Sequence, residues 1–303
     1  MKEFEILSKK IITPTLLMPC RDGSPLFLTP DMASKLDFQG YDVPCESLIL
    51  MNPTNLVQMA KLDSSKVTFA HMLSTNCGVN GENHVTISGT SRSRVTMEAF
   101  SSSVNAMGVD AVVSLADLAS SGKSNFRQQK AVTRTIGYYE HLKENFKGFI
   151  IGNIVGEDRH KDDNPYLMQK TRCKEGLDGC DSFIGSETNG SIRFHLQDEP
   201  IERILCLAAK VDVISARKCL EEACTKGHAF VFTNDLHIDL RDEKYADDFS
   251  PISKDCKCYT CSRFTCAYLN HLLFTKEMLV NTLLMMHNFH ALQNKIMQSH
   301  MSA

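Results

Sequence analysis

Three cysteines and one histidine near the C-terminus follow the order Cys256-x-Cys258-x2-Cys261-x25-His287. Three thiolates and one imidazole are the ligands of a closed, four-coordinate Zn²⁺ site. The short arm that carries the cysteines places the three sulfurs on one tight turn, so the fourth ligand must come from the element that follows. The spacing therefore predicts one zinc ion bound by Cys256, Cys258, Cys261 and His287.

The fourth ligand, His287, lies in the clearest helical pattern of the chain, residues 275–297. Apolar residues recur there with the period of a helix, at Met278, Leu279, Leu283, Met286, Phe289, Leu292 and Ile296. His287 stands at the edge of this apolar stripe and can face the cysteine turn. His290, one turn further on, is the alternative ligand, although a histidine on an apolar face is more often a packed core residue.

A zinc ion with four protein ligands has no open position for water, so the predicted site is structural rather than catalytic. The metal should hold together a small subdomain, residues 245–303, whose own core is slight. Residues 1–244 then form the body of the protein. Any chemistry would belong to that body.

The remaining nine of the 12 cysteines are expected to be structural. Several lie in apolar runs, such as Cys206 between Leu205 and Leu207, where a thiol packs as a small apolar side chain. The N-terminus has no charged-then-apolar secretory pattern, and it carries Glu3 and Glu5, which disfavour an organellar transit peptide. We therefore expect reduced cysteines and a cytoplasmic protein.

The composition is that of a soluble globular protein, with 303 residues of which 43% are apolar and 23% charged. The charge is uneven. The segment from Pro251 onward contains five basic and two acidic residues and so has a net charge of +3, whereas the whole chain carries −3. A locally basic zinc segment could contact a phosphate backbone. A solvated surface of mixed charge explains the same count equally well.

Upstream of the zinc segment, short apolar strands alternate with amphipathic helices. The pattern over 104–115 is a helix end, a glycine turn and a buried strand. Further strand patterns occupy 148–155, 191–195 and 211–214, and helix patterns occupy 131–144 and 199–210. Such repeated units predict a parallel sheet covered by helices, either a (β/α) barrel or an open doubly wound sheet. The polar stretch 156–190 is typical of a loop, and the sequence contains no Gly-rich phosphate loop, Ser elbow or paired-carboxylate motif.

The C-terminal segment 245–261, which ends in Asp-Cys-Lys-Cys-Tyr-Thr-Cys, resembles the zinc end of queuine tRNA-ribosyltransferases, also called tRNA-guanine transglycosylases. The similarity continues through 267–273 and 284–289 and is thinner upstream. The resemblance implies an α/β fold with a (β/α)8-type barrel, complete or incomplete, and a C-terminal zinc-binding subdomain. It also implies exchange of guanine for queuine at the wobble position of tRNAs with GUN anticodons, those for Asp, Asn, His and Tyr.

The chain departs from the family where the chemistry should be. The family's nucleophilic aspartate closes a Val-Asp-Met-Phe-Asp motif, but the matching stretch here ends in Ser215. A serine hydroxyl with no base beside it is a poor nucleophile. The Asp-Ser-Gly-Gly-Phe-Gln motif has no counterpart in 73–94, and the Gly-Gly-Leu-Ala-Val-Gly-Glu loop is missing within 156–190. Asp117 either matches a base-contacting aspartate of the family or is a capping or loop residue.

These departures look like those of the eukaryotic accessory subunit of the family. The resemblance then implies a chain without catalytic residues that forms a heterodimer with a catalytic queuine tRNA-ribosyltransferase subunit, binds tRNA with a GUN anticodon, and pairs with itself when alone. It also implies a cytoplasmic protein that can attach to the mitochondrial outer membrane. The surface of 264–284 is the expected partner surface, with core packing of the zinc lobe as the alternative.

Two other functions fit the same residues. The first is a free-standing base-exchange enzyme that uses another carboxylate, such as Asp212 or Asp178. The second is a zinc-stapled RNA- or protein-binding module with no link to base exchange.

Overall fold

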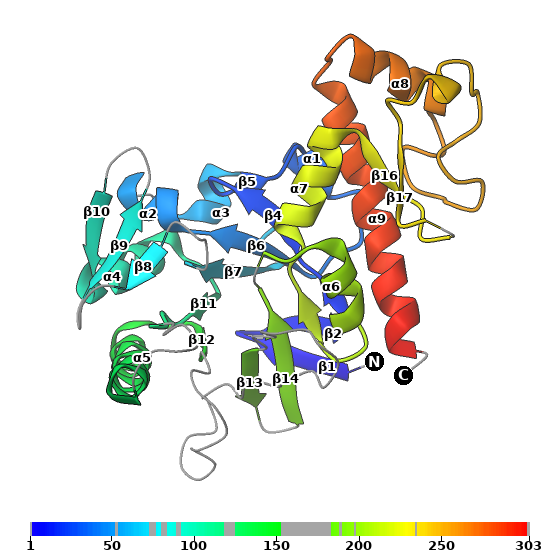
Figure 1. Cartoon of the computed structure of the whole chain (residues 1–303). Coiled ribbons are helices and arrows are strands. Elements are labelled where there is room, and N and C mark those ends of the chain that lie inside the picture. The colour runs from blue at the N-terminus through cyan, green and yellow to red at the C-terminus, as the bar shows by residue number, and fades with distance from the viewer. Residues whose placement is uncertain are drawn as a thin grey trace.

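A computed structural model describes residues 2–51, 54–72, 77–79, 84–88, 92–117, 125–152, 183–187, 190–196, 198–233 and 235–301 (Figure 1). The chain opens with an antiparallel hairpin of β1 (Lys2–Ile6) and β2 (Lys9–Thr13). The next strand is interrupted only at Leu17, which separates β3 (Thr15–Leu16) from β4 (Met18–Arg21). This interrupted strand belongs to two sheets and joins them.

The first sheet has the order β12-β11-β7-β6-β4-β5, and the second has the order β13-β14-β15-β3. Their remaining members are β5 (Ser24–Pro25), β6 (Gly40–Pro44), β7 (Val67–His71), β11 (Ala111–Val113), β12 (Phe149–Ile151), β13 (Phe183–Glu187), β14 (Gly190–His195) and β15 (Val213–Ile214). All neighbouring pairs are parallel except those made by β5 and β13. The join at Leu17, whose N–H donates to Ile214 O at 2.9 Å, gives a continuous parallel run from β12 to β14.

Side chains from both sheets meet in one apolar cluster inside this run. Its members are Ile6, Ile11, Leu17, Val67, Phe69, Ala111, Val113, Ile151, Phe194, Leu196 and Val213. Strands that share an interior must curve around it, as in a barrel, and the β1–β2 hairpin supplies Ile6 and Ile11 at one end. Among the described strands β12 pairs with neither β13 nor β14, so a complete barrel is not shown. The predicted α/β fold with a parallel sheet is confirmed.

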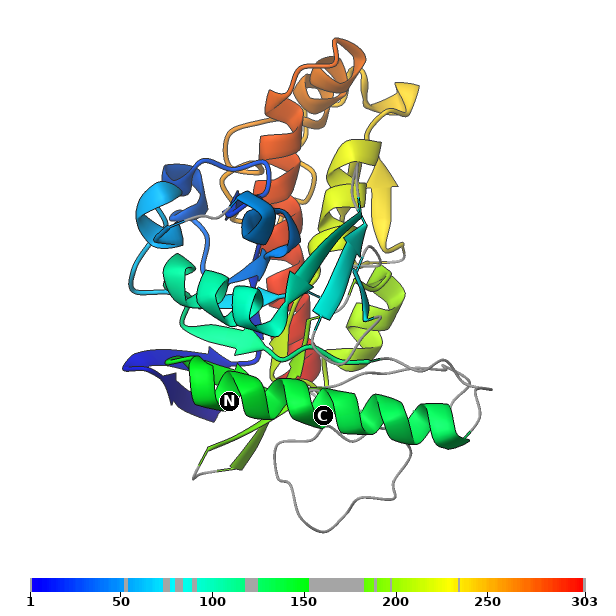
Figure 2. The same cartoon turned by 90° about the vertical axis from the view of Figure 1, so that its left-hand side faces the viewer.

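Helices cover the outer side of the strands (Figure 2). They are α1 (Pro30–Ala33), α2 (Glu46–Met51), α3 (Leu56–Met59), α4 (Met97–Met107), α5 (Asn125–Asn145), α6 (Ile201–Leu207) and α7 (Arg217–Lys226). Helix α4 begins after Thr96, whose hydroxyl accepts the N–H of Ala99, and ends at Gly108, whose φ of 65° only glycine adopts easily. A separate antiparallel ribbon of β8 (Cys77–Val79), β9 (His84–Ser88) and β10 (Arg92–Thr96) precedes α4.

The strand and helix patterns predicted in the body appear as β11, α5, β12, β14, α6 and β15. The loop predicted at 156–190 is wrong at its end, where β13 forms because it pairs antiparallel with β14. The rest of that stretch, up to residue 182, lies outside the described residues, as does the compressed unit expected there. The helix predicted at 275–297 begins later, because Thr275 caps α8 (Cys266–Phe274) and Lys276 has a φ of 58°.

The C-terminal part contains a hairpin of β16 (His228–Phe230) and β17 (His237–Asp239), a 3-10 turn (Glu243–Tyr245), α8, and the long helix α9 (Leu279–Met301). The cysteine turn, α8 and the start of α9 together form a lobe, called the metal lobe below. Helix α9 runs from this lobe down the side of the body (Figure 1). The N–H of Leu16 donates to Gln293 Oε1 at 2.7 Å, and Thr282 Oγ1 donates to Phe27 O at 2.7 Å. The predicted division at residues 244 and 245 stays a prediction. Among the described residues no helix is both long and apolar enough to cross a membrane.

Candidate metal centre

The three cysteines lie on a tight turn that precedes α8. The N–H of Ser262 donates to Cys258 O at 3.1 Å, and the N–H of Phe264 donates to Thr260 O at 2.9 Å. Thr260 is fully buried, and its hydroxyl donates to Leu283 O on α9 at 2.6 Å. Backbone turns of this kind bring sulfurs with the predicted spacing together, and Thr260 fastens the turn to the helix that carries the fourth ligand.

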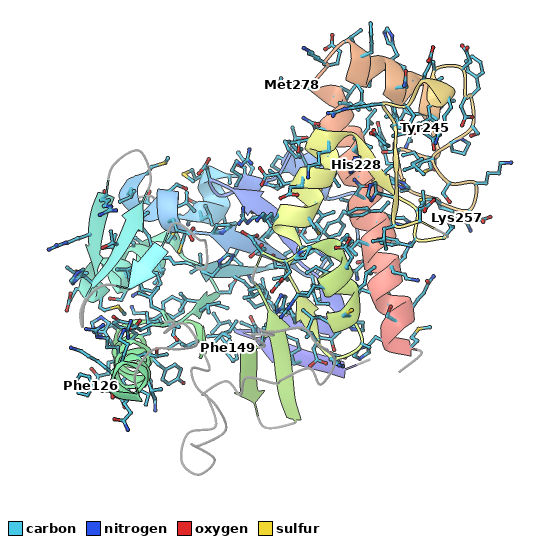
Figure 3. All side chains as sticks on the ribbon, viewed as in Figure 1. Phe126, Phe149, His228, Tyr245, Lys257 and Met278 are labelled. Atoms are coloured by element: carbon cyan, nitrogen blue, oxygen red, sulfur yellow. The ribbon has the colours of Figure 1, made fainter. Side chains whose placement is uncertain are left out.

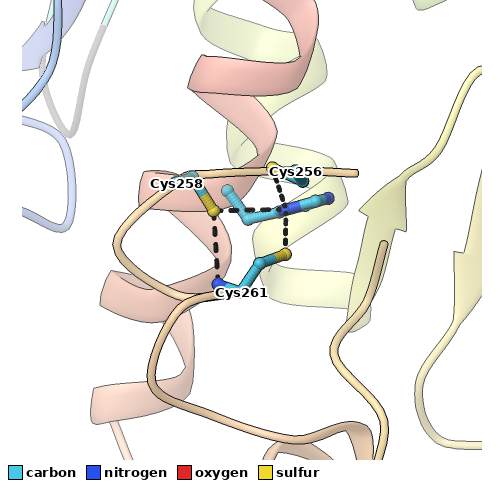
Figure 4. A group of neighbouring side chains, drawn as sticks. Cys256, Cys258 and Cys261 are labelled. Atoms are coloured by element: carbon cyan, nitrogen blue, oxygen red, sulfur yellow. Dashed lines mark hydrogen bonds between the residues drawn. The ribbon is translucent and has the colours of Figure 1, made fainter. Parts of the chain in front are cut away.

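The Nδ1 atom of His287 faces all three sulfurs. Figure 4 shows the three labelled cysteines around this contact, with dashed lines for the interactions. The Nδ1 atom lies 3.8 Å from Cys256 Sγ, 3.6 Å from Cys258 Sγ and 3.3 Å from Cys261 Sγ. Two ligands on one tetrahedral zinc ion, with bonds of about 2.3 Å to sulfur and 2.0 Å to nitrogen, are about 3.6 Å apart. The four ligand atoms all lie within 4.8 Å of one another. The predicted residues therefore form a Cys3His group that can hold one metal ion.

The orientation of the imidazole is fixed from its other side. His287 is 1% exposed, and its Nε2 lies 2.8 Å from the carbonyl oxygen of Phe230, the last residue of β16. A carbonyl oxygen can only accept, so Nε2 carries a proton and Nδ1 is the atom left for a metal. Sequence reasoning identified His287 but missed Phe230, because a backbone partner leaves no side-chain signal.

The ligands of the group influence one another's titration. Hydrogen bonds among the thiols lower the pKa of Cys256 and raise the pKa of Cys261. Burial would lower the pKa of His287, but hydrogen bonds with Cys256 and Cys258 outweigh it and raise the pKa to about 9. A proton and a metal ion therefore compete for the same group of ligand atoms.

His290, the alternative ligand, is not a member of the group. It is half-buried one turn further along α9, and its Nε2 lies 3.1 Å from Asn294 Nδ2. The geometry favours His287.

Six cysteines outside this group, whose side chains the structure describes, have free thiols. Five of them are buried, namely Cys20, Cys45, Cys219, Cys224 and Cys266. Cys206 is exposed on α6, so the apolar packing predicted for it is wrong. Burial raises the pKa of Cys219 to about 12 and that of Cys266 to about 11. Such thiols stay protonated at neutral pH and serve as apolar packing, which is the role predicted for them.

A second cluster of buried polar residues lies at the carboxyl ends of the parallel strands. Asp42 lies in β6, His71 is the last residue of β7, and Ser215 follows β15. Ser215 Oγ donates to Asp42 Oδ2 at 2.6 Å, and His71 Nε2 lies 2.6 Å from Asp42 Oδ1. The expectation that no base lies beside Ser215 is therefore wrong, because strand β6 brings a distant carboxylate to it. Ligand sites of parallel α/β proteins lie at this end of the sheet.

The imidazole of this cluster is paired with a carboxylate. Burial disfavours the charge of His71, but attraction to Asp42 and the hydrogen bond with it outweigh burial, so the pKa of His71 is raised. Among the described residues, His71 Nδ1 has no hydrogen-bond partner. Sequence reasoning missed Asp42 and His71, although a charged residue within an apolar strand is a signal, because such residues are rarely buried without a partner.

The other predicted carboxylates lie elsewhere. Asp212 precedes β15 at its amino end, where its carbonyl accepts the N–H of Thr15 at 2.9 Å, so it is at the opposite end of the strand from Ser215. Asp178 lies outside the described residues. Asp117 is buried and binds Arg127 at 2.6 Å and Arg134 at 3.0 Å. Its carboxylate is therefore engaged in an ion pair rather than open to a ligand.

Parallel strands curved around an apolar interior, together with a Cys3His group beside a long C-terminal helix, define an α/β protein with a closed metal site. Residues 204–300 match the family profile described as "TGT: Queuine tRNA-ribosyltransferase". The matched residues make up about a third of the chain and include the metal group, in agreement with the resemblance predicted from the sequence.

Individual relatives agree with this family. The queuine tRNA-ribosyltransferases of Francisella tularensis subsp. novicida and subsp. tularensis are each 32% identical over 168 residues, which cover 52% of this chain and 41% of each relative. The "Queuine tRNA-ribosyltransferase accessory subunit 2" of Caenorhabditis briggsae is 46% identical over 71 residues, 21% of this chain and 19% of the relative. The chain thus spans about two fifths of the length of the Francisella relatives.

Proposed function

We propose that this chain is a non-catalytic subunit of a heterodimeric queuine tRNA-ribosyltransferase, in which a catalytic subunit exchanges guanine for queuine at the wobble position of tRNAs with GUN anticodons. The observation that carries the proposal is the hydrogen bond from Ser215 Oγ to Asp42 Oδ2 at 2.6 Å. The hydroxyl of the serine at the carboxyl end of β15 is therefore engaged as a donor to Asp42. The Caenorhabditis relative, named as an accessory subunit, supports the same role.

A nucleophile that attacks a ribose carbon must be accessible to the substrate, even where an adjacent base can take its proton. Ser215 is 1% exposed and keeps its proton directed at Asp42, and Asp42 is fully buried. The two oxygens of Asp42 are each engaged, one by Ser215 and one by His71. Neither residue meets the requirement in this arrangement.

Zn²⁺ suits the Cys3His donor set, since thiolates and imidazole are its preferred ligands at four-coordinate structural sites. Cys256, Cys258, Cys261 and His287 would hold it. When bound, the ion would join the cysteine turn to α9. This role is structural and leaves the chemistry to the partner.

The outer end of the metal lobe offers a surface for the catalytic subunit. Phe274 is 86% exposed and Met278 84% exposed, and both lie at the turn between α8 and α9. Met278 lies at the tip of the lobe, away from the body (Figure 3). Clustered exposed apolar side chains are typical of interaction sites. Leu269 and Leu272 of α8 are buried, so core packing explains only the inner part of the predicted surface.

The decisive experiment measures incorporation of labelled guanine or queuine into a GUN-anticodon tRNA. It compares this chain alone, the catalytic subunit alone, and the two together. We expect activity only in the mixture. Exchange by this chain alone would contradict the proposal, and an exchange rate that the chain never changes would contradict the subunit role.

A different observation favours an RNA-binding module as the second candidate. Three aromatic rings follow one another on the metal lobe, with centroids 6.1 Å apart for Tyr259 and Phe264 and 5.4 Å apart for Phe264 and Tyr268. The guanidinium of Arg263 lies 4.3 Å from the Tyr259 ring. Aromatic platforms with cations bind single-stranded nucleic acid with little sequence preference. This function predicts binding to tRNA that ignores the anticodon.

A further inference from the structure

Asp42, His71 and Ser215 face the interior that the strands enclose. Asp42 pairs in register with Phe69, whose ring belongs to the interior cluster, so the two side chains share one face of the sheet. His71 follows Phe69 by two residues, and Ser215 follows the interior residue Val213 by two. The period of two along a strand places all three polar groups at one end of that interior.

The cluster contains one carboxylate, that of Asp42, and both of its oxygens are used. The carboxylate of Asp42 is fully buried. One of its oxygens accepts a hydrogen bond from the Ser215 hydroxyl, and the other lies 2.6 Å from Nε2 of His71. A carboxylate can be buried as an ion only when it is paired and hydrogen-bonded in this way. The two oxygens of Asp42 therefore each have a partner of the right kind.

A further cation close enough to influence His71 is already paired. Arg217, two residues after Ser215, is bonded to Asp198 and lies 3.9 Å from Glu221. A second carboxylate at the cluster would therefore have no positive charge of its own. The side chain of an aspartate at position 215 would reach one bond beyond the present Ser215 Oγ, which is already 2.6 Å from Asp42.

We propose that positions 42 and 215 hold a single buried negative charge between them, with Asp42 as the positioning residue that carries it and Ser215 as its hydrogen-bond donor. Two carboxylates at hydrogen-bond distance cannot both ionise, so Asp42 excludes a carboxylate from the carboxyl end of β15. The inference rests on the proposed function in one respect. If the chain is a non-catalytic subunit, the charge of Asp42 explains why position 215 has no carboxylate nucleophile. A carboxylate could be introduced at position 215 only if the charge of Asp42 were removed.

Three variants of the full chain distinguish the effect of an added charge at position 215 from the effect of a larger side chain there. S215D adds a carboxylate, S215N adds a side chain of the same shape without charge, and D42N/S215D moves the charge from β6 to β15. In the double variant the amide nitrogen introduced at position 42 can donate to the new carboxylate, and the amide oxygen at the same position can accept the proton of His71 Nε2. The double variant therefore restores a single charge to the cluster and gives it a hydrogen-bond donor.

Thermal unfolding at pH 7 and pH 5 measures the coupling. At pH 7 we expect S215D to melt at least about 5 °C below S215N, and D42N/S215D to recover most of that difference. The deficit of S215D should shrink at pH 5, because one of the paired carboxyls then takes a proton and donates to the other. The titratable and charged groups around Asp42 are Cys20 of β4, Glu46 of α2, His71 of β7, Asp198 after β14, and Arg217 of α7. D42N, measured alone, completes the cycle.

Equal melting temperatures of S215D and S215N, or a double variant no more stable than S215D, would overturn the inference. If S215D does not fold at pH 7 while S215N and the double variant do, the inference is supported. If S215N also fails to fold, size rather than charge is responsible, and the inference is wrong. These readouts involve no base exchange. Exchange activity of the unmodified chain alone would therefore refute the proposed function without touching the coupling.

Discussion

The Nε2 atom of His287 lies 2.8 Å from the carbonyl oxygen of Phe230, and this contact determines which nitrogen of the imidazole points toward the cysteines. Phe230 ends β16, so the β16–β17 hairpin positions a ligand that belongs to α9. The metal group is thereby tied to three segments, namely the hairpin, the cysteine turn and the long helix. Loss of the metal should loosen all three.

Cys258→Ser should remove the metal and lower the stability of residues 256–303. A serine hydroxyl is a much poorer zinc ligand than a thiolate, and zinc binding to such sites contributes about 10 kcal/mol or more to folding of small zinc domains. Because α9 also packs on the body, we expect a fall in melting temperature of about 10 °C rather than complete unfolding. Zinc content by elemental analysis should drop from one ion per chain to none.

Cys206→Ser is the matched control for that prediction, because Cys206 is exposed and lies outside the metal group. It should keep both its zinc and its resistance to proteolysis. Unchanged zinc content in Cys258→Ser would refute the ligand assignment. Chelator treatment of the unmodified chain should reproduce the Cys258→Ser melting curve.

Replacing the two histidines of α9 in turn tests the choice between them. His287→Gln removes both the metal ligand at Nδ1 and the donor to Phe230, so metal affinity should fall at least about 100-fold. His290→Gln should leave the affinity within a few-fold. Competition with a chromogenic zinc chelator measures both variants. A larger loss in His290→Gln than in His287→Gln would reverse the assignment.

The Asp42–His71 pair predicts a dependence of stability on pH. The pKa of His71 is raised in the folded chain, so the folded state binds a proton more tightly than the unfolded state. The resulting stabilisation is fully present below the unfolded pKa of about 6.5 and is lost as pH rises through the higher folded pKa. Urea unfolding between pH 5.5 and 9 should show this fall in the free energy of unfolding.

His71→Gln isolates the effect from other groups that titrate in the same range. Gln has no titrating proton, and its amide can still donate to Asp42. The difference in unfolding free energy between the unmodified chain and His71→Gln should decrease as pH rises. A difference that stays constant from pH 5.5 to 9 would mean that His71 does not carry the extra proton.

The ion pairs of Asp117 predict a change at acid pH. Burial would raise the pKa of Asp117, but hydrogen bonds from Arg127 and Arg134 outweigh it, so the pKa lies below the ordinary value. The stabilisation is present above the unfolded pKa of about 3.9 and is lost as pH falls through the folded value. Asp117→Asn should cost about 2 kcal/mol at pH 7, because charged hydrogen bonds are lost, and less at pH 3. Asp37→Asn, at an exposed aspartate, should change the stability by less than about 0.5 kcal/mol.

The metal group could be predicted in full from sequence because its ligands are few, chemically distinctive and close together in the chain. The strand that precedes Ser215 was predicted for a similar reason, since β15 is an apolar run after a helix. The start of α9 was misplaced because apolar periodicity runs across Lys276, whose left-handed backbone ends the previous helix. Periodicity reports which face is buried and does not detect such a break.

Asp42 and His71 could not be assigned from sequence, because their partnership joins residues 29 positions apart, and Ser215 is 173 positions from Asp42. Only the parallel pairing of β6 with β7, and the curvature that brings β15 near them, make the contact. Strand β13 escaped prediction for a related reason, since pairing with β14 rather than its own composition makes it a strand.

Phe274→Ser should weaken association with the catalytic subunit without changing the fold. The side chain is 86% exposed at the end of α8, so its removal leaves the core of this chain intact. Exposed aromatic residues contribute much of the binding energy when an interface covers them, and we expect at least a 10-fold rise in Kd, or about 1.4 kcal/mol. Phe126→Ser is the matched control, since Phe126 is 76% exposed on α5, far from the metal lobe in Figure 3. Sedimentation of each variant with the catalytic subunit gives the Kd values. Equal Kd values for the two variants would place the interface elsewhere than the α8–α9 turn.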